Sequence, residues 1–407
     1  MTQTQAFQAN SPADDQAMLA MAYTELYQAG KQAWAKATAL DILDYVLTEM
    51  RSPEGLFFSA EDADSSGREG AFYTWTYEEI RSLVSSEDLD DFCKAYDVKQ
   101  GGNFRDPVSN TREGGNILHL EKDAEALAQG SERTPRSIEA SLDRARQALL
   151  RARAERERPF RDEKCLVDWN GLMIAALAKA ATAFAKERFL HAAIAAQAAL
   201  EKHLRVEGVL LHSYFSGKAK IPAFLNDHAF YAWGLLELHQ ATLDAGYLKK
   251  CEEELRQIES GFKDNNGGLF LSREGEVRTR EVHDGALPSG NSVAAFVAAR
   301  AVVLDEDLEV DARPIVEASW RQVAADPGAH AFMLMAAQQV LRPAAHLEVG
   351  NEAHDLLAIV RRDLHPRLMI GQVTALQAGA RLCGPSACLP APKNAEELRA
   401  QLLQEKA

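Results

Sequence analysis

The sequence has few of the features that mark secreted or membrane-spanning proteins. Its five cysteines are scattered among 407 residues, which predicts a reduced, cytoplasmic protein without a disulfide scaffold. Cys383 and Cys388 are the one close pair, and they lack the spacing and histidine partners of a zinc site. There is no apolar run of 18 residues, and residues 1–10 are polar. We therefore expect neither a transmembrane helix nor a signal peptide.

Basic charge is also scarce. Lys and Arg number 45 against 60 Asp and Glu, so the net charge is -15. This excess of acid argues against nucleic acids and anionic membranes as partners, because both are bound through basic patches. The sequence has no phosphate-binding loop, dinucleotide fingerprint, serine-hydrolase elbow or EF-hand loop. We therefore expect no cofactor and no metal.

Helical periodicity dominates what is present, since hydrophobic residues make up 46% of the chain and recur at three- and four-residue spacing. The pattern predicts pairs of helices joined by short turns. The predicted helices are 17–28 with 32–50, 171–186 with 189–204, 228–243 with 247–261, and 291–304 followed by 312–324 and 329–341.

A short repeat separates these pairs. Segments 55–59, 208–213 and 268–272 each begin with glycine, continue with apolar residues and contain a serine. Each copy predicts a glycine turn leading into a short strand. Helix pairs linked alternately by short turns and long strand-bearing loops are typical of a closed α/α toroid, in which parallel inner helices gather their N-termini at one end. A helical bundle that is not closed is the alternative.

Two regions depart from this pattern. Residues 78–158 form a charged insertion with a long surface helix near 137–156. Residues 345–349, 352–361 and 367–370 predict a β-α-β unit, followed by a last helix at 395–405. We therefore expect an all-α toroid over residues 11–342 and a small α/β appendage over 343–407 that packs on it.

Polar clusters precede three of the inner helices. Asp168, Trp169 and Asn170 stand at one start, where a carboxylate beside an indole can orient a sugar ring. Asp227 and His228 stand at another, where an imidazole can act as a general base. The alternative for each aspartate is a helix cap.

The third start carries His283, Asp284, Ser289 and Asn291, which we interpret as substrate-binding candidates or as a turn with a cap. A fourth cluster lies in a loop among aromatic residues. It comprises Glu61, Asp62 and Asp64, close to Trp75, and a crowded carboxylate there would have the raised pKa of a general acid. The alternative is a solvated turn.

These clusters, in this order, resemble the thioredoxin-domain-containing proteins related to spermatogenesis-associated protein 20. The similar stretches cover nearly the whole chain and are 55–80, 116–119, 158–176, 227–238, 284–295 and 383–390. The resemblance implies a six-hairpin α/α toroid like that of glycoside hydrolases and N-acylglucosamine 2-epimerases. The family's thioredoxin-like domain and first barrel helices have no counterpart here, so we expect a ring that lacks its first hairpin and has no redox activity.

The leading hypothesis is a carbohydrate-active protein that binds a sugar in the toroid mouth and acts by general acid/base catalysis. Hydrolysis would use Asp168 with Glu61 or Asp62, whereas epimerisation would use His228 with His283. The alternative is a non-catalytic scaffold that binds a thioredoxin-like domain or associates with itself through its truncated edge.

Overall fold

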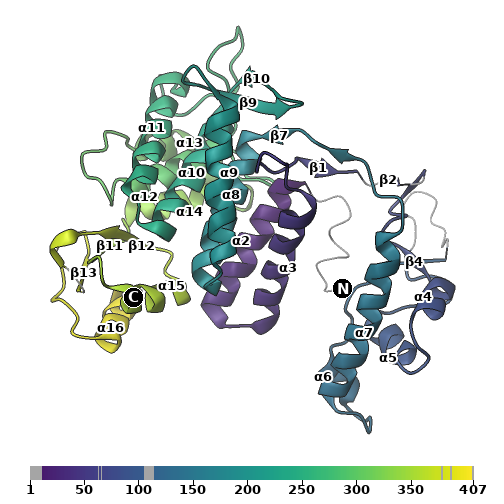
Figure 1. The fold of residues 1–407 in the computed structure, drawn as a ribbon. Coiled ribbons are helices and arrows are strands. Elements are labelled where there is room, and N and C mark those ends of the chain that lie inside the picture. The colour runs from purple at the N-terminus through teal and green to yellow at the C-terminus, as the bar shows by residue number, and fades with distance from the viewer. Residues whose placement is uncertain are drawn as a thin grey trace. The chain divides into compact units, whose positions relative to one another are not determined.

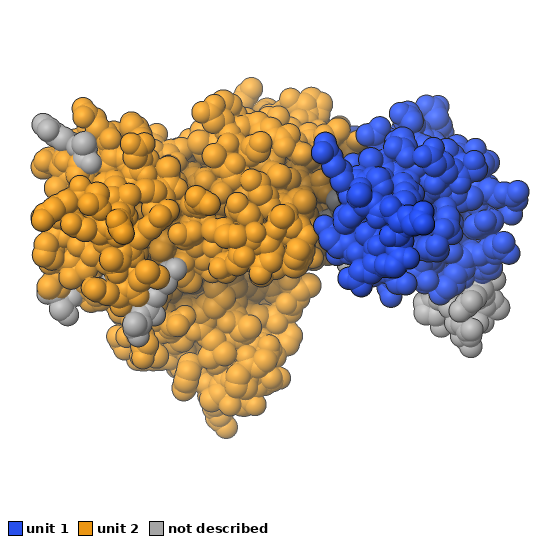
Figure 2. Space-filling model, turned by 90° about the horizontal axis from the view of Figure 1, so that it is seen from below, with its two compact units in different colours: residues 1–12, 60–162 blue, residues 13–59, 163–407 orange. Residues whose placement is uncertain are grey.

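The computed structural model describes residues 12–62, 64–65, 67–104, 114–376, 379–385 and 387–405. The polar segment 1–10 lies outside these residues. The chain divides into two compact units, one containing residues 60–162 and the other containing residues 13–59 and 163–407 (Figure 2). Each unit is described by itself below.

The larger unit is built from helical hairpins. Its helices are α2 (Ala13–Gly30), α3 (Ala33–Glu49), α8 (Val167–Phe184), α9 (Glu187–Leu204), α10 (Leu225–Thr242), α11 (Ala245–Phe262), α12 (Gly290–Ala301), α13 (Arg313–Ala325), the 3-10 turn η1 (Pro327–His330) and α14 (Ala331–Leu341). Helices α2, α8, α10, α12 and α14 form an inner row in which each packs against the next, and α3, α9, α11 and α13 pack outside it (Figure 1). The predicted fold class, helical hairpins of an α/α toroid with short strands in the loops, is confirmed.

Small residues explain how closely the inner helices approach one another. A Cβ atom at Gly171 of α8 would lie 2.6 Å from the backbone of Phe230 and Tyr231 on α10. A Cβ atom at Gly234 of α10 would in turn lie 2.7 Å from the carbonyl oxygen of Gly171. The two helices therefore touch backbone to backbone, at a separation that only glycine permits.

Short strands lie in the loops that lead into the inner helices. Strand β9 (Val209–Phe215) pairs with β7 (Cys165–Leu166), β8 (Arg205–Val206) and β10 (Lys218–Pro222). Of the three repeat copies, the one at 208–213 forms this strand, while the other two form single bridges at Phe57 and Leu269. Their backbone groups bond instead to the side chains of Asn170 and Asn291, at 2.8 to 3.0 Å.

The C-terminal residues form a small sheet with two helices. Strand β11 (Ala345–Val349), helix α15 (His354–Arg362) and strand β12 (Leu368–Gln372) make the expected parallel β-α-β unit. Strand β13 (Ala380–Cys383) adds an antiparallel edge, η2 (Thr374–Leu376) precedes it, and α16 (Ala395–Glu405) ends the described chain. A disulfide joins Cys383 to Cys388, so the expectation of a chain without disulfides is wrong for this pair; their spacing alone did not indicate it.

The smaller unit has a core of its own. Its helices are α4 (Tyr77–Leu83), α5 (Leu89–Ala95), α6 (Ala124–Ala128) and α7 (Pro135–Ala154), and its two-residue strands are β1 (Ala60–Glu61), β2 (Asp64–Ser65), β3 (Arg68–Glu69), β4 (Trp75–Thr76), β5 (Gly115–Asn116) and β6 (Arg161–Asp162). Ile138, Leu142 and Leu149 on α7 pack against Phe92 and Trp75. The apolar stripe of α7 thus covers the core, and its charged face is left to solvent.

No helix among the described residues is long and apolar enough to cross a membrane.

Candidate functional site

Two carboxylates meet where α8 and α10 begin. Asp168 lies in the first turn of α8 and Asp227 in the first turn of α10. The backbone N–H of Asp168 donates to Asp227 Oδ1 at 3.2 Å, so the two helix starts are in direct contact. Both carboxylates also lie at the positive ends of helix dipoles, which favour negative charge there.

Strand β9 adds a histidine to this pair. In the pairing of β9 with β7, Ser213 lies opposite Leu166, the residue before α8. The preceding residue on β9, His212, is therefore carried to the start of α8. Its Nδ1 atom lies 2.9 and 3.0 Å from the two carboxylate oxygens of Asp227. We call Asp168, His212 and Asp227 the Asp168 cluster.

Asp227 is fully buried, and its carboxylate is saturated with hydrogen bonds. Oδ1 accepts from the Asp168 N–H and faces His212 Nδ1, while Oδ2 accepts from the Phe224 N–H at 2.7 Å and also faces Nδ1. A carboxylate held in this way fixes the orientation of the imidazole ring. Asp227 therefore positions His212 and leaves its Nε2 atom to face outward from the pair.

The electrostatics of the cluster bring two groups into the neutral range. Burial, together with the charge of Asp227, raises the pKa of Asp168 to about 7, although His212 and the Trp169 N–H oppose the rise. The hydrogen bond to Asp227 raises the pKa of His212. Asp168 is therefore protonated far more readily than an ordinary aspartate, and His212 stays cationic to higher pH than an ordinary histidine.

A third carboxylate acts on the cluster from the first turn of α2. Asp14 is 6% exposed, and its charge contributes to the raised pKa of Asp168. Burial and the neighbouring Asp15 raise the pKa of Asp14 itself to about 6. Among the described residues, none forms a hydrogen bond with its Oδ1 atom. The starts of α2, α8 and α10 thus share one acidic environment.

The spacing of the cluster would admit a cation, since one ligand atom from each of Asp168, His212 and Asp227 lies within 4.8 Å of the others. We assign none there. The Asp227 oxygens already interact with three groups, which are the Asp168 N–H, the Phe224 N–H and His212 Nδ1 shared between both oxygens. The cluster thus places two titratable side chains, Asp168 and His212, beside one buried carboxylate.

Four other residues that were predicted to bind substrate form hydrogen bonds with the backbone. Asn170 bonds Phe57 and the Leu166 carbonyl, and Asn291 bonds Leu269 and the Glu281 carbonyl. Ser289 caps α12 by accepting from the Ser292 N–H. Asp284 accepts from the backbone N–H groups of Ser289, Phe332 and Met333, at 2.8 to 3.0 Å.

The two predicted histidines of the larger unit, His228 and His283, contact residues outside the Asp168 cluster. His228 is 3% exposed, and its Nδ1 atom lies 2.6 Å from Glu254 Oε2, while Arg205 pairs with the other oxygen of Glu254. His283 is exposed and its ring lies 6.0 Å from that of His330. Trp169 is partly buried against the main core and follows Asp168 directly.

The remaining predicted residues belong to the smaller unit. Glu61 is buried and accepts from the Tyr73 hydroxyl at 3.4 Å, whereas Asp62 and Asp64, the first residue of β2, are exposed. Trp75 is 1% exposed and packs under the guanidinium of Arg156, 3.7 Å from the ring centroid. In this unit Trp75 is a core residue, and its participation in ligand binding stays a prediction.

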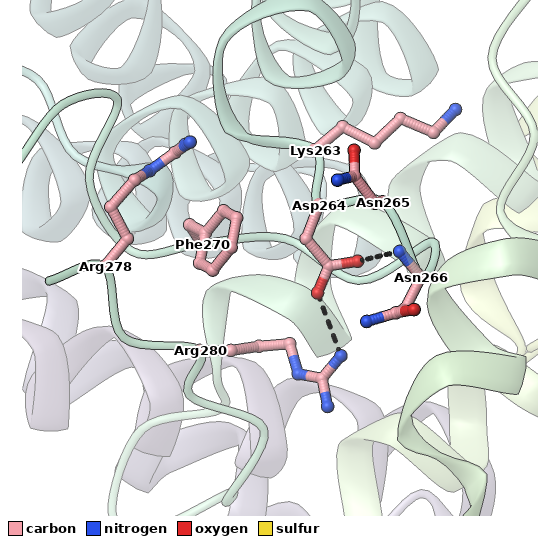
Figure 3. A pocket seen from close by; sticks show the side chains of 7 residues that line it. All are labelled: Lys263, Asp264, Asn265, Asn266, Phe270, Arg278 and Arg280. Atoms are coloured by element: carbon pink, nitrogen blue, oxygen red, sulfur yellow. Dashed lines mark hydrogen bonds and ion pairs between the residues drawn. The ribbon is translucent and has the colours of Figure 1, made fainter.

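A separate hollow of about 520 Å³ lies on the loop between α11 and α12 (Figure 3). Arg280 points to the Asp264 carboxylate at 3.0 Å, and Arg278 stacks on Phe270, 4.2 Å from its ring centroid. Arg278 also donates to the carbonyls of Ser272 and Gly261, and Lys263 pairs with Glu259. The cationic side chains that line this hollow thus already form contacts that stabilise the loop.

Sequence reasoning missed His212 and Asp14. His212 lies inside the glycine-led repeat, at the place where the other two copies have Ser59 and Ser272. A histidine in one copy of a repeat, where its counterparts carry serine, was the available signal. Asp14 lies in the first turn of an inner helix, as Asp168 and Asp227 do, and the same position was the signal for it.

Comparison with known proteins places this sequence among named relatives. No protein-family model matches the chain. It is 29% identical over 315 residues to spermatogenesis-associated protein 20 of Homo sapiens and 30% identical to that of Mus musculus, with 69% of this chain covered in each case. The chain is related to spermatogenesis-associated protein 20. The match spans 40% of the length of these relatives.

Solved structures with similar folds include sugar epimerases. One is described as a sugar epimerase from a ruminal bacterium, with a TM-score of 0.46 and 10% identity, covering 79% of this chain and 61% of that one. Another is cellobiose 2-epimerase from Spirochaeta thermophila, with a TM-score of 0.46 and 11% identity, covering 78% and 61%.

Proposed function

We propose that this chain is a carbohydrate-active protein that performs general acid/base chemistry at the Asp168 cluster. The observation that carries the proposal is the pairing of a carboxyl whose pKa is about 7 with a histidine that Asp227 holds in place. Groups that titrate near the working pH are the effective proton donors and acceptors. Partly exposed Trp169 beside Asp168 supplies an apolar face of the kind that sugar rings stack on.

The charges of His212 and Asp168 decide which of them donates a proton and which accepts one. His212 is the proton donor, because hydrogen bonding to Asp227 keeps its imidazolium form to higher pH. Asp168 is the proton acceptor in the fraction of molecules where it is ionised, and burial makes that ionised form a stronger base than a solvated aspartate. In this proposal His212 takes the place that sequence reasoning gave to His228, because His228 is buried against Glu254.

The scaffold hypothesis predicts that the acidic clusters are paired with Arg158, Arg161 or Lys164. Among the described residues, Asp168 and Asp227 interact instead with His212 and with backbone N–H groups. This supports the catalytic proposal over the scaffold.

A two-part experiment tests the proposal. Thermal unfolding of the chain is measured with a panel of neutral sugars, uronic acids and amino sugars, for the wild type and for Asp168→Asn, His212→Gln and the exposed control Asp355→Asn. We expect one class of sugar to raise the Tm of the wild type and of the control, with a smaller rise in the two cluster variants.

The stabilising sugar is then incubated with the protein in heavy water and followed by proton NMR. Deuterium incorporation at a ring carbon indicates epimerisation, whereas release of a reducing end indicates hydrolysis. Loss of an acid/base group typically slows turnover 10²- to 10⁴-fold, and we expect a decrease of about 100-fold or more in each cluster variant. Turnover that persists in Asp168→Asn, or a panel that leaves Tm unchanged, would refute the proposal.

A further inference from the structure

The hollow on the loop between α11 and α12 has an excess of positive charge in its wall (Figure 3). Three cationic side chains line it, those of Lys263, Arg278 and Arg280, against a single carboxylate, that of Asp264. The chain as a whole has a net charge of -15, so the sign of this wall is opposite to that of the protein. A concave wall of positive charge favours anions.

Two of the three cations are already offset by carboxylates. Asp264 accepts from two backbone N–H groups of its own turn, at 2.7 and 3.0 Å, through Oδ1 and from Arg280 at 3.0 Å through Oδ2. Lys263 pairs with Glu259, which lies outside the wall. The one carboxylate of the wall is therefore fully engaged and compensates Arg280 alone.

Arg278 is the cation that has no carboxylate partner among the described residues. Its Nε atom donates to the Ser272 carbonyl at 2.8 Å and its Nη2 atom to the Gly261 carbonyl at 3.1 Å, while its guanidinium stacks on Phe270. The side chain is partly exposed. These contacts fix the guanidinium without neutralising it, and a group that is held in place in advance binds an anion at a lower cost in entropy.

Two amides add neutral hydrogen-bonding groups to the wall. Asn265 and Asn266 are exposed, and among the described residues none forms a hydrogen bond with either side chain. In Figure 3, Arg278 and Phe270 lie on one side of Asp264, and the two asparagines lie on the other. An amide both donates to and accepts from a hydroxyl group. The wall thus offers a fixed cation, part of an apolar ring and two groups that suit hydroxyls.

The shape of the hollow is fixed by the loop itself. Gly267 has φ +92°, and a Cβ atom there would lie 2.9 Å from Pro314 of α13, so the turn is seated directly on that helix. The Leu271 carbonyl accepts from the N–H of Leu225, the first residue of α10, at 2.9 Å. Both ends of the segment that forms the wall are therefore tied to helices, and the hollow is preformed.

We propose that this hollow binds an acidic monosaccharide, whose carboxylate or phosphate group faces Arg278 and whose hydroxyl groups bond Asn265 and Asn266. The ring carbons of the sugar would contact Phe270. The volume of about 520 Å³ lies within the range of about 300–1,000 Å³ that is typical of small-molecule sites. No residue of this wall belongs to the Asp168 cluster, so binding here is independent of the proposed catalysis.

NMR titration observed on the ligand, with the whole chain at constant ionic strength, tests the site. The probes are D-glucuronate and glucose 6-phosphate, which represent the carboxylate and phosphate forms of the same chemistry. D-glucose lacks the charge, and inorganic phosphate lacks the sugar ring. We expect at least one of the two acids to bind the wild type, about tenfold or more tightly than D-glucose or inorganic phosphate.

Two wall variants and two matched surface variants locate the binding. Arg278→Gln removes the uncompensated charge. Asn266→Asp places a second carboxylate in the wall at almost unchanged size and keeps the backbone N–H that holds the turn. We expect each to weaken binding of the acid about tenfold or more. The exposed counterparts Arg321→Gln and Asn351→Asp should bind as the wild type does, and so should Asp168→Asn.

Three results would overturn the proposal. The first is absence of binding by both acids. The second is an affinity for D-glucose or inorganic phosphate equal to that for the acids, which would show that the charge or the ring is irrelevant. The third is wild-type affinity in Asn266→Asp, a variant that keeps every contact of Arg278. An acid whose binding is lost in Asp168→Asn and kept in Asn266→Asp would occupy the Asp168 cluster, so failure here is distinguishable from failure of the proposed function.

Discussion

At the scale of single residues, asparagine side chains replace the hydrogen bonds of a partner strand at the starts of two inner helices, α8 and α12. Asn291 is fully buried, donates to the carbonyls of Leu269 and Glu281, and accepts from the Leu269 N–H. Asn170 does the same for Phe57. A buried amide that bonds both groups of one residue replaces two ladder hydrogen bonds, which explains why these loops need no continuous sheet.

Substitution of Asn291 tests this account. Asn291→Ala would leave the N–H and C=O of Leu269 and the Glu281 carbonyl unpaired in the interior. We expect the free energy of unfolding to fall by about 2 kcal/mol or more, because unsatisfied buried polar groups carry the full cost of desolvation. Urea unfolding measures the change. The exposed control Asn265→Ala should stay within about 0.5 kcal/mol of the wild type, and a similarly small change in Asn291→Ala would contradict the account.

Some residues of the candidate site could be predicted from the sequence, and others could not. Asp168 and Asp227 could be predicted because carboxylates at helix starts are visible in the pattern of residues. His212 could not, since its role depends on the pairing of β9 with β7, in which Leu166 lies opposite Ser213. Asn170, Asn291 and Ser289 have the residue types of a binding site, but only tertiary contacts reveal that they bond the backbone. Long-range pairing is the information that local patterns lack.

At the scale of elements, α8 and α10 contact each other through their backbones. Gly171 and Gly234 face each other there, and the nearest atoms to a side chain added at Gly171 would be backbone atoms, which cannot move aside as a flexible side chain can. These two glycines therefore set the distance between the two helices. Helix periodicity predicted the hairpins, because an amphipathic stripe of this length has few alternatives.

Gly171→Ala is therefore expected to destabilise the larger unit. Alanine is intrinsically better than glycine in a helix by about 1 kcal/mol, but the added methyl group would lie 2.6 Å from the backbone of α10 and force the helices apart. Overpacking of this kind typically costs 1–3 kcal/mol, so we expect a lower Tm and a net loss of up to about 2 kcal/mol.

Gly246→Ala is the matched control for this substitution. Gly246 lies in the first turn of α11, and the nearest atom to an added methyl group is a carboxylate oxygen of Asp244, a side chain that can move. Its Tm should be unchanged or slightly raised. If Gly171→Ala proved as stable as Gly246→Ala, the close approach of α8 and α10 would be refuted.

At the scale of the whole molecule, Asp14 and Asp168 of the larger unit and Asp88 of the smaller unit have opposite pH dependence. In the larger unit, burial raises the pKa of Asp14 to about 6 and that of Asp168 to about 7. The folded state therefore binds more protons than the unfolded state between pH 3.8 and these values, and stability falls as pH rises through that range. The raised pKa of His212 has the same sign, because its stabilising charge is lost as pH rises above 6.5.

Asp88 of the smaller unit has the reverse dependence. Arg144 donates to Asp88, and Ser141 and Ser85 also bond that carboxylate, so its pKa is lowered to about 2. The unfolded state then binds more protons than the folded state between pH 2 and 3.8. The stability contributed by Asp88 is present above that range and is lost as pH falls through it.

Hydrogen exchange read by mass spectrometry resolves the two units in one experiment. After correction for intrinsic rates, a rise from about pH 5 to about pH 8 should reduce protection in α8 and α10 while leaving α7 unchanged. A fall from about pH 4 to about pH 2 should reduce protection in α5 and α7. The double variant Asp14→Asn, Asp168→Asn should flatten the first response, whereas Asp355→Asn should not. A parallel response of both units at both ends of the range would show that net charge governs the stability of the chain, and that the raised and lowered carboxyls do not.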